Sequence, residues 1–138
     1  MIEASRRTGM LANLPAKEAA MIVMVFEFEV EPREYDSYLE EAAGLRPCLA
    51  QVDGFVSVER FESQATPGRF VAIGYFRDED AVARWRNLPE HRRAQALGRS
   101  RFFAGYRLVM AHVLRDYTHH LRDTVPADSK LVHDGRSA

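Results

Sequence analysis

The order of strand-like and helix-like segments is the feature that most constrains this chain. Residues 21–30 alternate with a period of two and are rich in β-branched and aromatic residues, which predicts a strand. Pro32 then opens an amphipathic helix, because it stands where the first turn of a helix tolerates proline. Apolar residues recur along this helix at three- and four-residue spacing: Tyr35, Tyr38, Leu39, Ala42, Leu45 and Leu49. Gly44 and Pro47 weaken it.

A predicted hairpin follows the first helix. Asp53-Gly54 is a turn signal, and the alternating apolar residues 55–62 and 70–76 form two strands joined by a loop that contains Thr66-Pro67-Gly68. These two strands therefore pair antiparallel.

The last third of the domain is predicted to be a broken helix and a long strand. Asp78 begins the helix with acids in its first turn, which favours the positive end of the helix dipole. Leu88-Pro89 interrupts it, because a residue before proline avoids the helical region. A shorter helical piece runs to about Leu97, and we expect Gly98 to end it. Residues 101–117 form the fourth strand.

This β-α-β-β-α-β order predicts an α+β, ferredoxin-like fold, with a four-stranded antiparallel sheet and two helices on one face. Phe and Val occur on both parities of the first and fourth strands. The sheet face away from the helices is therefore also expected to be buried. Because an apolar sheet face of that size is rare on a monomer, we expect a homodimer paired through it.

Composition limits the partners and the compartment. The chain has 138 residues, 46% of them hydrophobic, and a formal net charge of −1, so overall charge favours neither nucleic acid nor a membrane. Cys48 is the only cysteine and fits a reducing cytoplasm. The polar, aperiodic residues 1–20 and 118–138 are predicted to be an N-terminal extension and a C-terminal arm of one domain, residues 21–117.

Charge divides the domain into two halves. Residues 21–62 hold ten acids and three bases, whereas residues 77–122 hold ten arginines and five acids. One interpretation is that the two helical layers carry opposite solvated faces. The other is that the arginines line a pocket for an anionic or polyphenolic ligand.

Three parts of the sequence carry a family resemblance: the Asp53-Gly54-Phe55 turn, the segment from Trp85 to Gln95 with the following Gly98-Arg99, and the closing Arg115-Asp116-Tyr117. Through them residues 21–117 resemble the antibiotic biosynthesis monooxygenases, a family of dimeric α+β barrel proteins. The resemblance implies the fold and the dimer. It does not imply one reaction, because the family includes cofactor-independent oxygenases, haem-degrading enzymes and members of unknown activity.

The oxygenase branch implies that an aromatic substrate itself supplies the electrons that reduce oxygen. Such a site needs a slot for a flat molecule, a group that takes or steers a proton, and a donor to the oxyanion. Trp85 is the candidate aromatic wall and His91 the candidate base. The candidate hydrogen-bond donors and substrate-binding residues are Tyr75, Tyr106, Arg107 and Gln95. No glycine-rich nucleotide loop or metal-ligand spacing is present, so we expect neither a cofactor nor a metal.

Two alternatives remain open. The first is a non-catalytic small-molecule-binding or stress-associated protein on the same fold. The second is haem binding or degradation, for which the resemblance implies an asparagine on the first strand and a histidine ten residues after the tryptophan. Here that tenth residue is Gln95, and residues 21–31 contain no asparagine. Six residues along a regular helix is about 240° of rotation, which would separate His91 from Trp85 unless the break at Pro89 re-aims it.

Each candidate also has a purely structural explanation. Trp85 can pack in the core, His91 can be a half-exposed residue bonded to the backbone or to Glu90, and Tyr75 and Tyr106 can be ordinary strand residues. If the face of Arg107 is buried, Arg107 needs an ion pair with Glu27 or Glu29. His119-His120 is a weak metal signal that fits a solvated pair equally well, and Cys48 has no histidine at a predictable distance.

Overall fold

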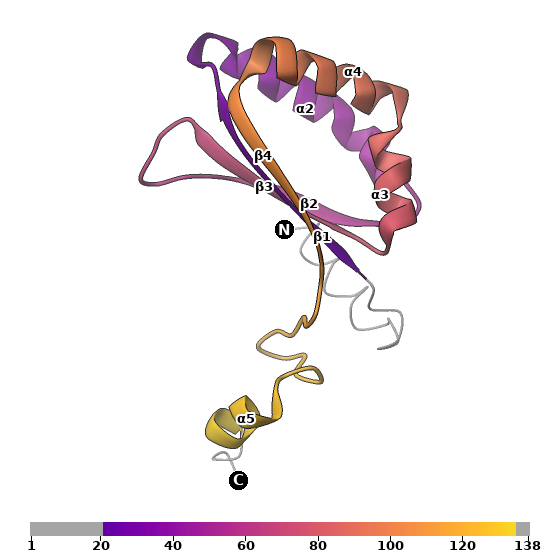
Figure 1. Ribbon diagram of the computed structural model, residues 1–138, viewed down its shortest axis with the longest axis vertical. Coiled ribbons are helices and arrows are strands. Elements are labelled where there is room, and N and C mark those ends of the chain that lie inside the picture. Colours follow the sequence, from indigo (N-terminus) through magenta and orange to yellow (C-terminus); the bar gives the residue numbers. More distant parts are fainter. Residues whose placement is uncertain (1–20, 135–138) are drawn as a thin grey trace.

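The computed structural model describes residues 21–134, which form one sheet with a helical layer over one face (Figure 1). The strands are β1 (Ile22–Val30), β2 (Phe55–Glu62), β3 (Arg69–Phe76) and β4 (Phe103–His112), and the main helices are α2 (Tyr35–Ala50), α3 (Glu79–Arg86) and α4 (Pro89–Leu97). All strand pairs are antiparallel, in the order β2-β3-β1-β4. The predicted α+β, ferredoxin-like fold is confirmed. The second predicted helix is two helices, as the break at Leu88-Pro89 indicated.

Short helical turns complete the chain. A 3-10 turn, η2 (Pro32–Glu34), precedes α2, and a π turn, η3 (Gly98–Phe102), follows α4. Beyond β4 the chain leaves the sheet as an extended segment that carries α5 (Ala127–Ser129) and η4 (Lys130–Asp134).

The predicted extension, residues 1–20, lies outside the described residues. Within residues 21–134 no helix combines the length and the apolar character needed to cross a bilayer.

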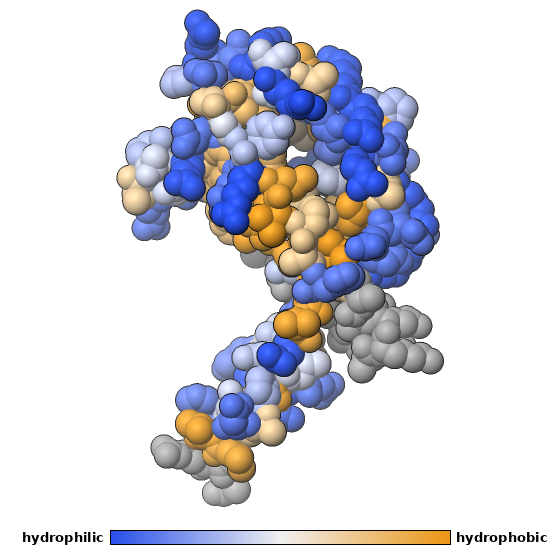
Figure 2. All heavy atoms as spheres, viewed as in Figure 1, coloured by the Kyte–Doolittle hydropathy of each residue, from blue (hydrophilic) through white to orange (hydrophobic). Residues whose placement is uncertain are grey.

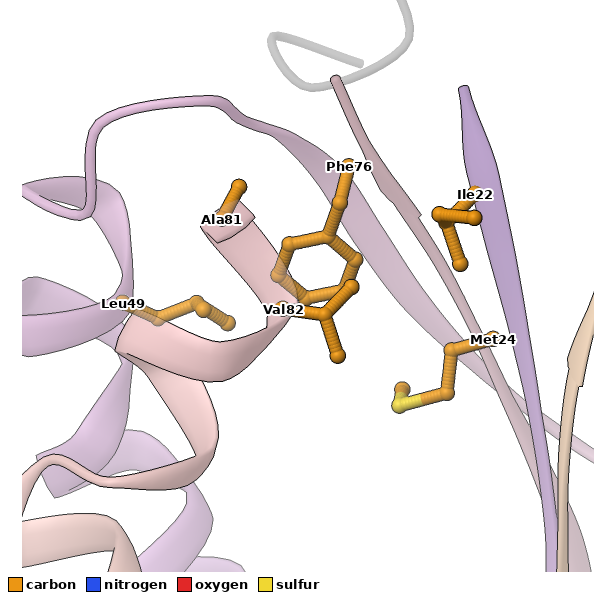
Figure 3. Packing of buried hydrophobic residues seen from close by; sticks show 6 residues of the cluster. All are labelled: Ile22, Met24, Leu49, Phe76, Ala81 and Val82. Atoms are coloured by element: carbon orange, nitrogen blue, oxygen red, sulfur yellow. The ribbon is translucent and has the colours of Figure 1, made fainter. Parts of the chain in front are cut away.

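β1 is the strand on which the core is built, because it pairs with both β3 and β4. Its even-numbered side chains face the helices, and Ile22 and Met24 are each 3% exposed. They pack with Leu49 of α2, Phe76 of β3, and Ala81 and Val82 of α3. Figure 3 shows the Phe76 ring in the middle of this cluster. Burial of a side chain the size of Phe76 contributes about 1.5–3 kcal/mol.

Aromatic rings form the second half of the core. Phe28 stacks on Phe70 of β3 with ring centroids 5.6 Å apart, and Tyr38 of α2 lies 5.3 Å from Phe28. Phe103, at the start of β4, contacts both Phe28 at 5.1 Å and Tyr38 at 5.7 Å. These contacts hold α2 and the start of β4 against the same end of β1.

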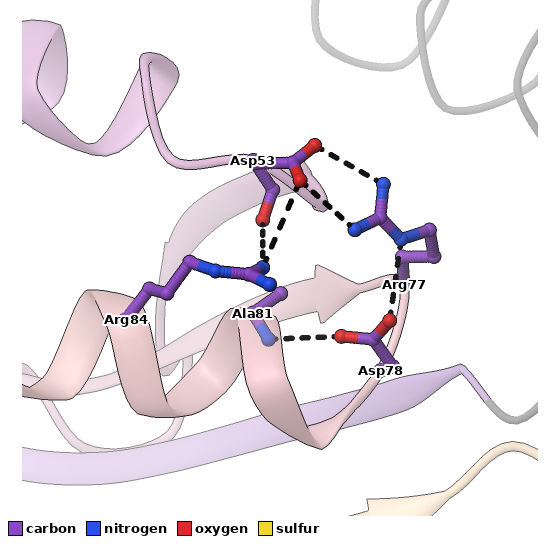
Figure 4. Close-up of polar contacts among 5 residues, drawn as sticks. All are labelled: Asp53, Arg77, Asp78, Ala81 and Arg84. Atoms are coloured by element: carbon purple, nitrogen blue, oxygen red, sulfur yellow. Dashed lines mark hydrogen bonds and ion pairs between the residues drawn. The ribbon is translucent and has the colours of Figure 1, made fainter.

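A network around Asp53 fixes the start of α3 (Figure 4). Arg77 donates to both carboxylate oxygens of Asp53 at 3.1 and 3.2 Å, and Arg84 donates to the Asp53 backbone carbonyl at 2.9 Å. Asp78 caps the helix, since its Oδ1 accepts from the backbone N–H of Ala81 at 2.9 Å. The hydrogen bonds from Arg77 hold the pKa of the Asp53 carboxyl below its ordinary value. The turn before β2 is thereby joined to the helix that carries Trp85.

The fourth strand is shorter than the predicted residues 101–117. Residues before Phe103 remain in the π turn, and Gly98, which follows the last residue of α4, keeps helical dihedrals (φ −58°, ψ −49°) and begins that turn. A Cβ atom at position 98 would lie 2.5 Å from the Phe103 ring, so close packing explains the glycine. At the other end, His112 pairs with Ile22, the first residue of β1. Because the two strands are antiparallel, the end of β4 faces the beginning of β1, and β4 has no partner residues in β1 beyond His112.

The predicted weakness of the first helix at Gly44 and Pro47 does not break it, and α2 continues to Ala50. Proline removes one hydrogen bond and crowds the preceding turn. The last turn nevertheless stays helical because Leu49, 9% exposed, packs into the core.

A substitution at Gly54 tests the contact between the turn before β2 and the start of α3. Its φ is +92°, and a Cβ atom there would lie 2.6 Å from the Ala81 Cβ and 3.3 Å from Arg77 Nη2. Gly68 also has a positive φ, +87°, but open space around it. We expect Gly54→Ala to lower the free energy of unfolding by about 3 kcal/mol, from backbone strain plus crowding, and Gly68→Ala by about 1 kcal/mol, from strain alone. Urea unfolding measures both, and equal losses would contradict the packing at Gly54.

Candidate functional site

Trp85 and His91 form a ring stack across the break between α3 and α4. Their ring centroids are 3.9 Å apart and their planes differ by 31°. On a regular helix the two side chains would point in different directions. Leu88, however, has an extended backbone (φ −59°, ψ 133°), and α4 restarts at Pro89 with a new direction. The break therefore brings the two candidates together.

The Trp85 side of the stack is part of the core. Its indole lies 5.4 Å from the Phe76 ring and packs against the first core cluster. Trp85 and His91 are both half-buried. The structural and the functional interpretation of Trp85 are therefore compatible, because one part of the residue packs on Phe76 while His91 covers another.

The His91 imidazole is held by Gln95, one turn further along α4. The Gln95 Nε2 lies 2.9 Å from His91 Nδ1. Burial lowers the pKa of His91 below its ordinary value of 6.5, a hydrogen bond with the Arg86 backbone opposes this shift, and the charge of Arg92 adds to the lowering. The imidazole is therefore neutral near physiological pH.

Gln95 in turn belongs to a chain of hydrogen bonds that runs from the end of α3 to α4. We call it the amide relay, and it consists of Asn87, Arg92 and Gln95. Arg92 donates from Nη1 to Gln95 Oε1 at 3.0 Å and from Nη2 to Asn87 Oδ1 at 2.6 Å. Asn87 donates to the backbone carbonyl of Ala83 at 2.9 Å. Gln95, a predicted substrate-binding residue, contacts His91 directly.

Tyr106 lies on the same side of the sheet as the stack. It pairs with Phe28 in β1, and directly opposed residues of an antiparallel pair point to one face. Leu108 and Met110 continue this row opposite Phe26 and Met24. The three side chains, which we call the open β4 row, are 53%, 51% and 38% exposed.

The open β4 row is apolar surface that the helical layer leaves uncovered. Figure 2 shows hydrophobic residues gathered at the centre of the visible face, with the more hydrophilic helical layer above them. Tyr106 also lies 6.0 Å from the Phe26 ring and 6.2 Å from Phe103, so the row continues into the aromatic core. Sequence reasoning did not select Leu108 and Met110. Their shared parity with Tyr106 on an edge strand was the signal that could have found them.

Arg107 and Tyr75 lie on the opposite face of the sheet. Arg107 pairs with Glu27 and Tyr75 with Val23, both odd-numbered residues of β1 that point away from the helices. Arg107 is exposed, and the ion pair of Glu27 is formed with Arg69 at 3.7 Å. Within one protomer, these two candidates do not share a site with His91.

The arginine-rich half pairs with the acidic half. Arg93 lies 3.1 Å from Glu41, Arg101 2.8 Å from Glu34, and Arg77 3.1 Å from Asp53. Glu41, Arg93 and Arg101 line an open cavity of about 500 Å³ between α2 and α4. A second cavity of about 320 Å³ lies near the end of β4, where Arg115 and Tyr117 form part of its wall. Trp85 and His91 line neither of them.

The remaining candidates are separate from the stack. Cys48 is half-buried on α2. His119 and His120 lie edge to face with ring centroids 4.6 Å apart in the segment after β4. Among residues 21–134, no three His, Cys, Asp or Glu side chains are grouped so that they could hold a metal ion.

The lowered pKa of His91 generates a prediction for stability. Because the folded pKa lies below the unfolded one, stability is lost as the pH falls from 6.5 toward the folded pKa. Histidine NMR titration should place His91 below 6.5. Between about pH 7 and about pH 5, His91→Phe, which keeps a ring on Trp85, should lose less unfolding free energy than the wild type. An equal loss in both proteins, with a titration at 6.5 or above, would contradict the buried position.

Comparison with curated proteins finds two relatives. The chain is 37% identical over 93 residues to the jasmonate monooxygenase ABM of Pyricularia oryzae, a match that covers 67% of this chain and 43% of that protein. It is 32% identical over 78 residues to the uncharacterized protein YqjZ of Bacillus subtilis, covering 56% of this chain and 67% of that one. The chain therefore spans less than half the length of the fungal relative.

Solved structures and a family pattern extend the comparison. SnoaB, a cofactor-independent oxygenase from Streptomyces nogalater, superposes with a TM-score of 0.58 at 20% identity over 70% of this chain and 96% of that one, which shows a common fold. The sequence pattern described as antibiotic biosynthesis monooxygenase matches residues 21–97, from the start of β1 to the end of α4. Because that match covers more than half of the chain, this protein belongs to the antibiotic biosynthesis monooxygenase family.

Proposed function

We propose that this protein is a cofactor-independent monooxygenase that oxidises a small aromatic, quinol or polyketide-like compound. The observation that carries the proposal is the neutral His91 imidazole, stacked on Trp85 on the side of the sheet where the open β4 row leaves aromatic and apolar surface uncovered. A flat aromatic molecule gains dispersion and stacking contacts on such a surface. The polar groups beside it are few, as in most small-molecule sites.

The chemistry requires the substrate to supply the electrons. In the oxidation of an anthrone, the substrate ionises to an enolate, which reduces oxygen. One oxygen atom replaces the two hydrogens of the reacting carbon as a carbonyl, and the other leaves with those hydrogens as water. The protein has to hold the flat ring system, stabilise the oxyanion and exclude bulk water. In this proposal His91 and the Tyr106 hydroxyl interact with the substrate oxygens, while Leu108 and Met110 contact its ring faces.

Two relatives support this reaction class. The fungal relative is named a jasmonate monooxygenase, and the Streptomyces structure is described as a cofactor-independent oxygenase. The substrates of these proteins are not carried over, since one match covers 43% of its protein and the other has 20% identity. Jasmonic acid is therefore one member of the substrate panel below.

Oxygen uptake by the purified protein tests the proposal. The panel consists of anthrones, naphthols, hydroquinones and jasmonic acid, without added cofactor. We expect turnover of at least one aromatic compound, and a loss of about 100-fold in kcat for His91→Ala. His133→Ala, on an exposed residue of η4, is the control and should keep wild-type activity.

The other outcomes separate the alternatives. Saturable binding of an aromatic compound without oxygen uptake would favour the non-catalytic binding protein. A Soret shift on addition of haem, with no turnover of the panel, would favour haem binding. Either result would overturn the oxygenase proposal.

We also propose a homodimer paired through the sheet face away from the helices. Val23 and Val25 lie there, opposite Ile73, Tyr75 and Val109 on the neighbouring strands. A second copy would remove this apolar surface from water. Exposed Arg107 lies beside it, next to the pair of Glu27 and Arg69.

Sedimentation velocity tests the dimer. Val25→Glu should dissociate it, because the new carboxylate would be buried in the interface without a partner. Leu108→Glu is the matched control, since it places the same charge on the opposite face of the same sheet and should leave the dimer intact. A monomeric wild type, or dissociation by both variants alike, would contradict this interface.

A further inference from the structure

The amide relay sets the protonation pattern of His91. We propose that Arg92 and Gln95 are positioning residues that hold His91 in the tautomer with hydrogen on Nε2, so that neither ring nitrogen of the neutral imidazole is free to accept a proton. This inference rests on the proposed function for the role of that nitrogen. The tautomer itself follows from the hydrogen bonds of α4.

The first step is the orientation of the Gln95 amide. A glutamine side chain presents one accepting oxygen and one donating nitrogen. Arg92 has only donors, and its Nη1 lies 3.0 Å from Gln95 Oε1, so the oxygen must face Arg92. Arg92 is itself held by Asn87, whose oxygen accepts from Nη2 at 2.6 Å. The Gln95 nitrogen therefore faces His91.

The second step is the tautomer. Gln95 Nε2 lies 2.9 Å from His91 Nδ1, and because this nitrogen only donates, Nδ1 must be the acceptor. In a neutral imidazole the hydrogen is then on Nε2. The same amide nitrogen lies 3.4 Å from the Arg86 carbonyl, so its second hydrogen has an acceptor as well. The Trp85 ring at 3.9 Å restricts rotation of the imidazole, which keeps Nδ1 on the Gln95 side.

This tautomer changes the part that His91 plays in the reaction. An Nε2–H group stabilises an oxyanion as a neutral donor, but it cannot remove a proton from the substrate at that nitrogen. The site then favours substrates that lose their proton to water near neutral pH, namely acidic enols and hydroxyquinones, over simple phenols. The amide relay therefore predicts a substrate class, which the presence of a histidine at position 91 does not predict by itself.

Nitrogen-15 NMR of the full chain tests the tautomer directly, because long-range proton–nitrogen correlations distinguish Nε2–H from Nδ1–H imidazole. We expect the wild type to show Nε2–H. Gln95→Glu should switch His91 to Nδ1–H and raise its pKa, since a carboxylate accepts from Nδ1. Arg93→Gln is the control, because Arg93 is the next residue on α4 but pairs with Glu41, and it should leave the tautomer unchanged.

Activity provides a second readout if the protein turns over a substrate. Gln95→Glu should lower kcat by about 100-fold with little change in KM, whereas Gln95→Met, which removes the amide without adding an acceptor, should give an intermediate loss. An Nδ1–H wild type would overturn the inference whatever the activity. An Nε2–H wild type that switches in Gln95→Glu would support the relay even if the panel shows no turnover and the proposed function fails.

Discussion

The conformation of Leu88 before Pro89 is the constraint on which the site depends. Proline excludes the helical region for the residue before it, so α3 ends and α4 begins with a different direction. That change of direction places His91 over Trp85, which a continuous helix would not do. It also sets α4 beside α2, where Arg93 reaches Glu41. One backbone constraint thereby connects the helical layer, the ring stack and the amide relay.

The two rings of the stack are held by different forces. Trp85 is positioned by apolar packing on Phe76, and the Asp53 network fixes the start of its helix. His91 is positioned by directional hydrogen bonds from Gln95, which depend in turn on Arg92. Packing resists displacement of the indole, whereas hydrogen bonds select the rotamer and the tautomer of the imidazole. In the proposed reaction, the two forces together would hold a polar group in place before the substrate binds, as stabilisation of an oxyanion requires.

The two faces of the sheet differ in the residues that they present. Even-numbered residues of β1 build the core beneath the helices, and their partners on β4 form the open β4 row. Odd-numbered residues face the other way, where Val23 and Val25 form the proposed dimer surface. Arg107 and Tyr75, selected from sequence as site residues, belong to that second face. In a strand, a difference of one in residue number is enough to move a side chain from one role to the other.

The sequence by itself determined the element order, the fold and the break at Pro89, because periodicity and proline are local signals. It also identified Trp85 and His91 as candidates, and the relation to the family through the segment that contains them. Only the tertiary structure decided that their rings stack, that Gln95 binds His91 and that Arg107 lies on the opposite face from both. Those facts depend on strand register and on the direction of a restarted helix, which no local pattern specifies. The end of β4 at His112 has the same origin, since a strand extends only as far as its partner.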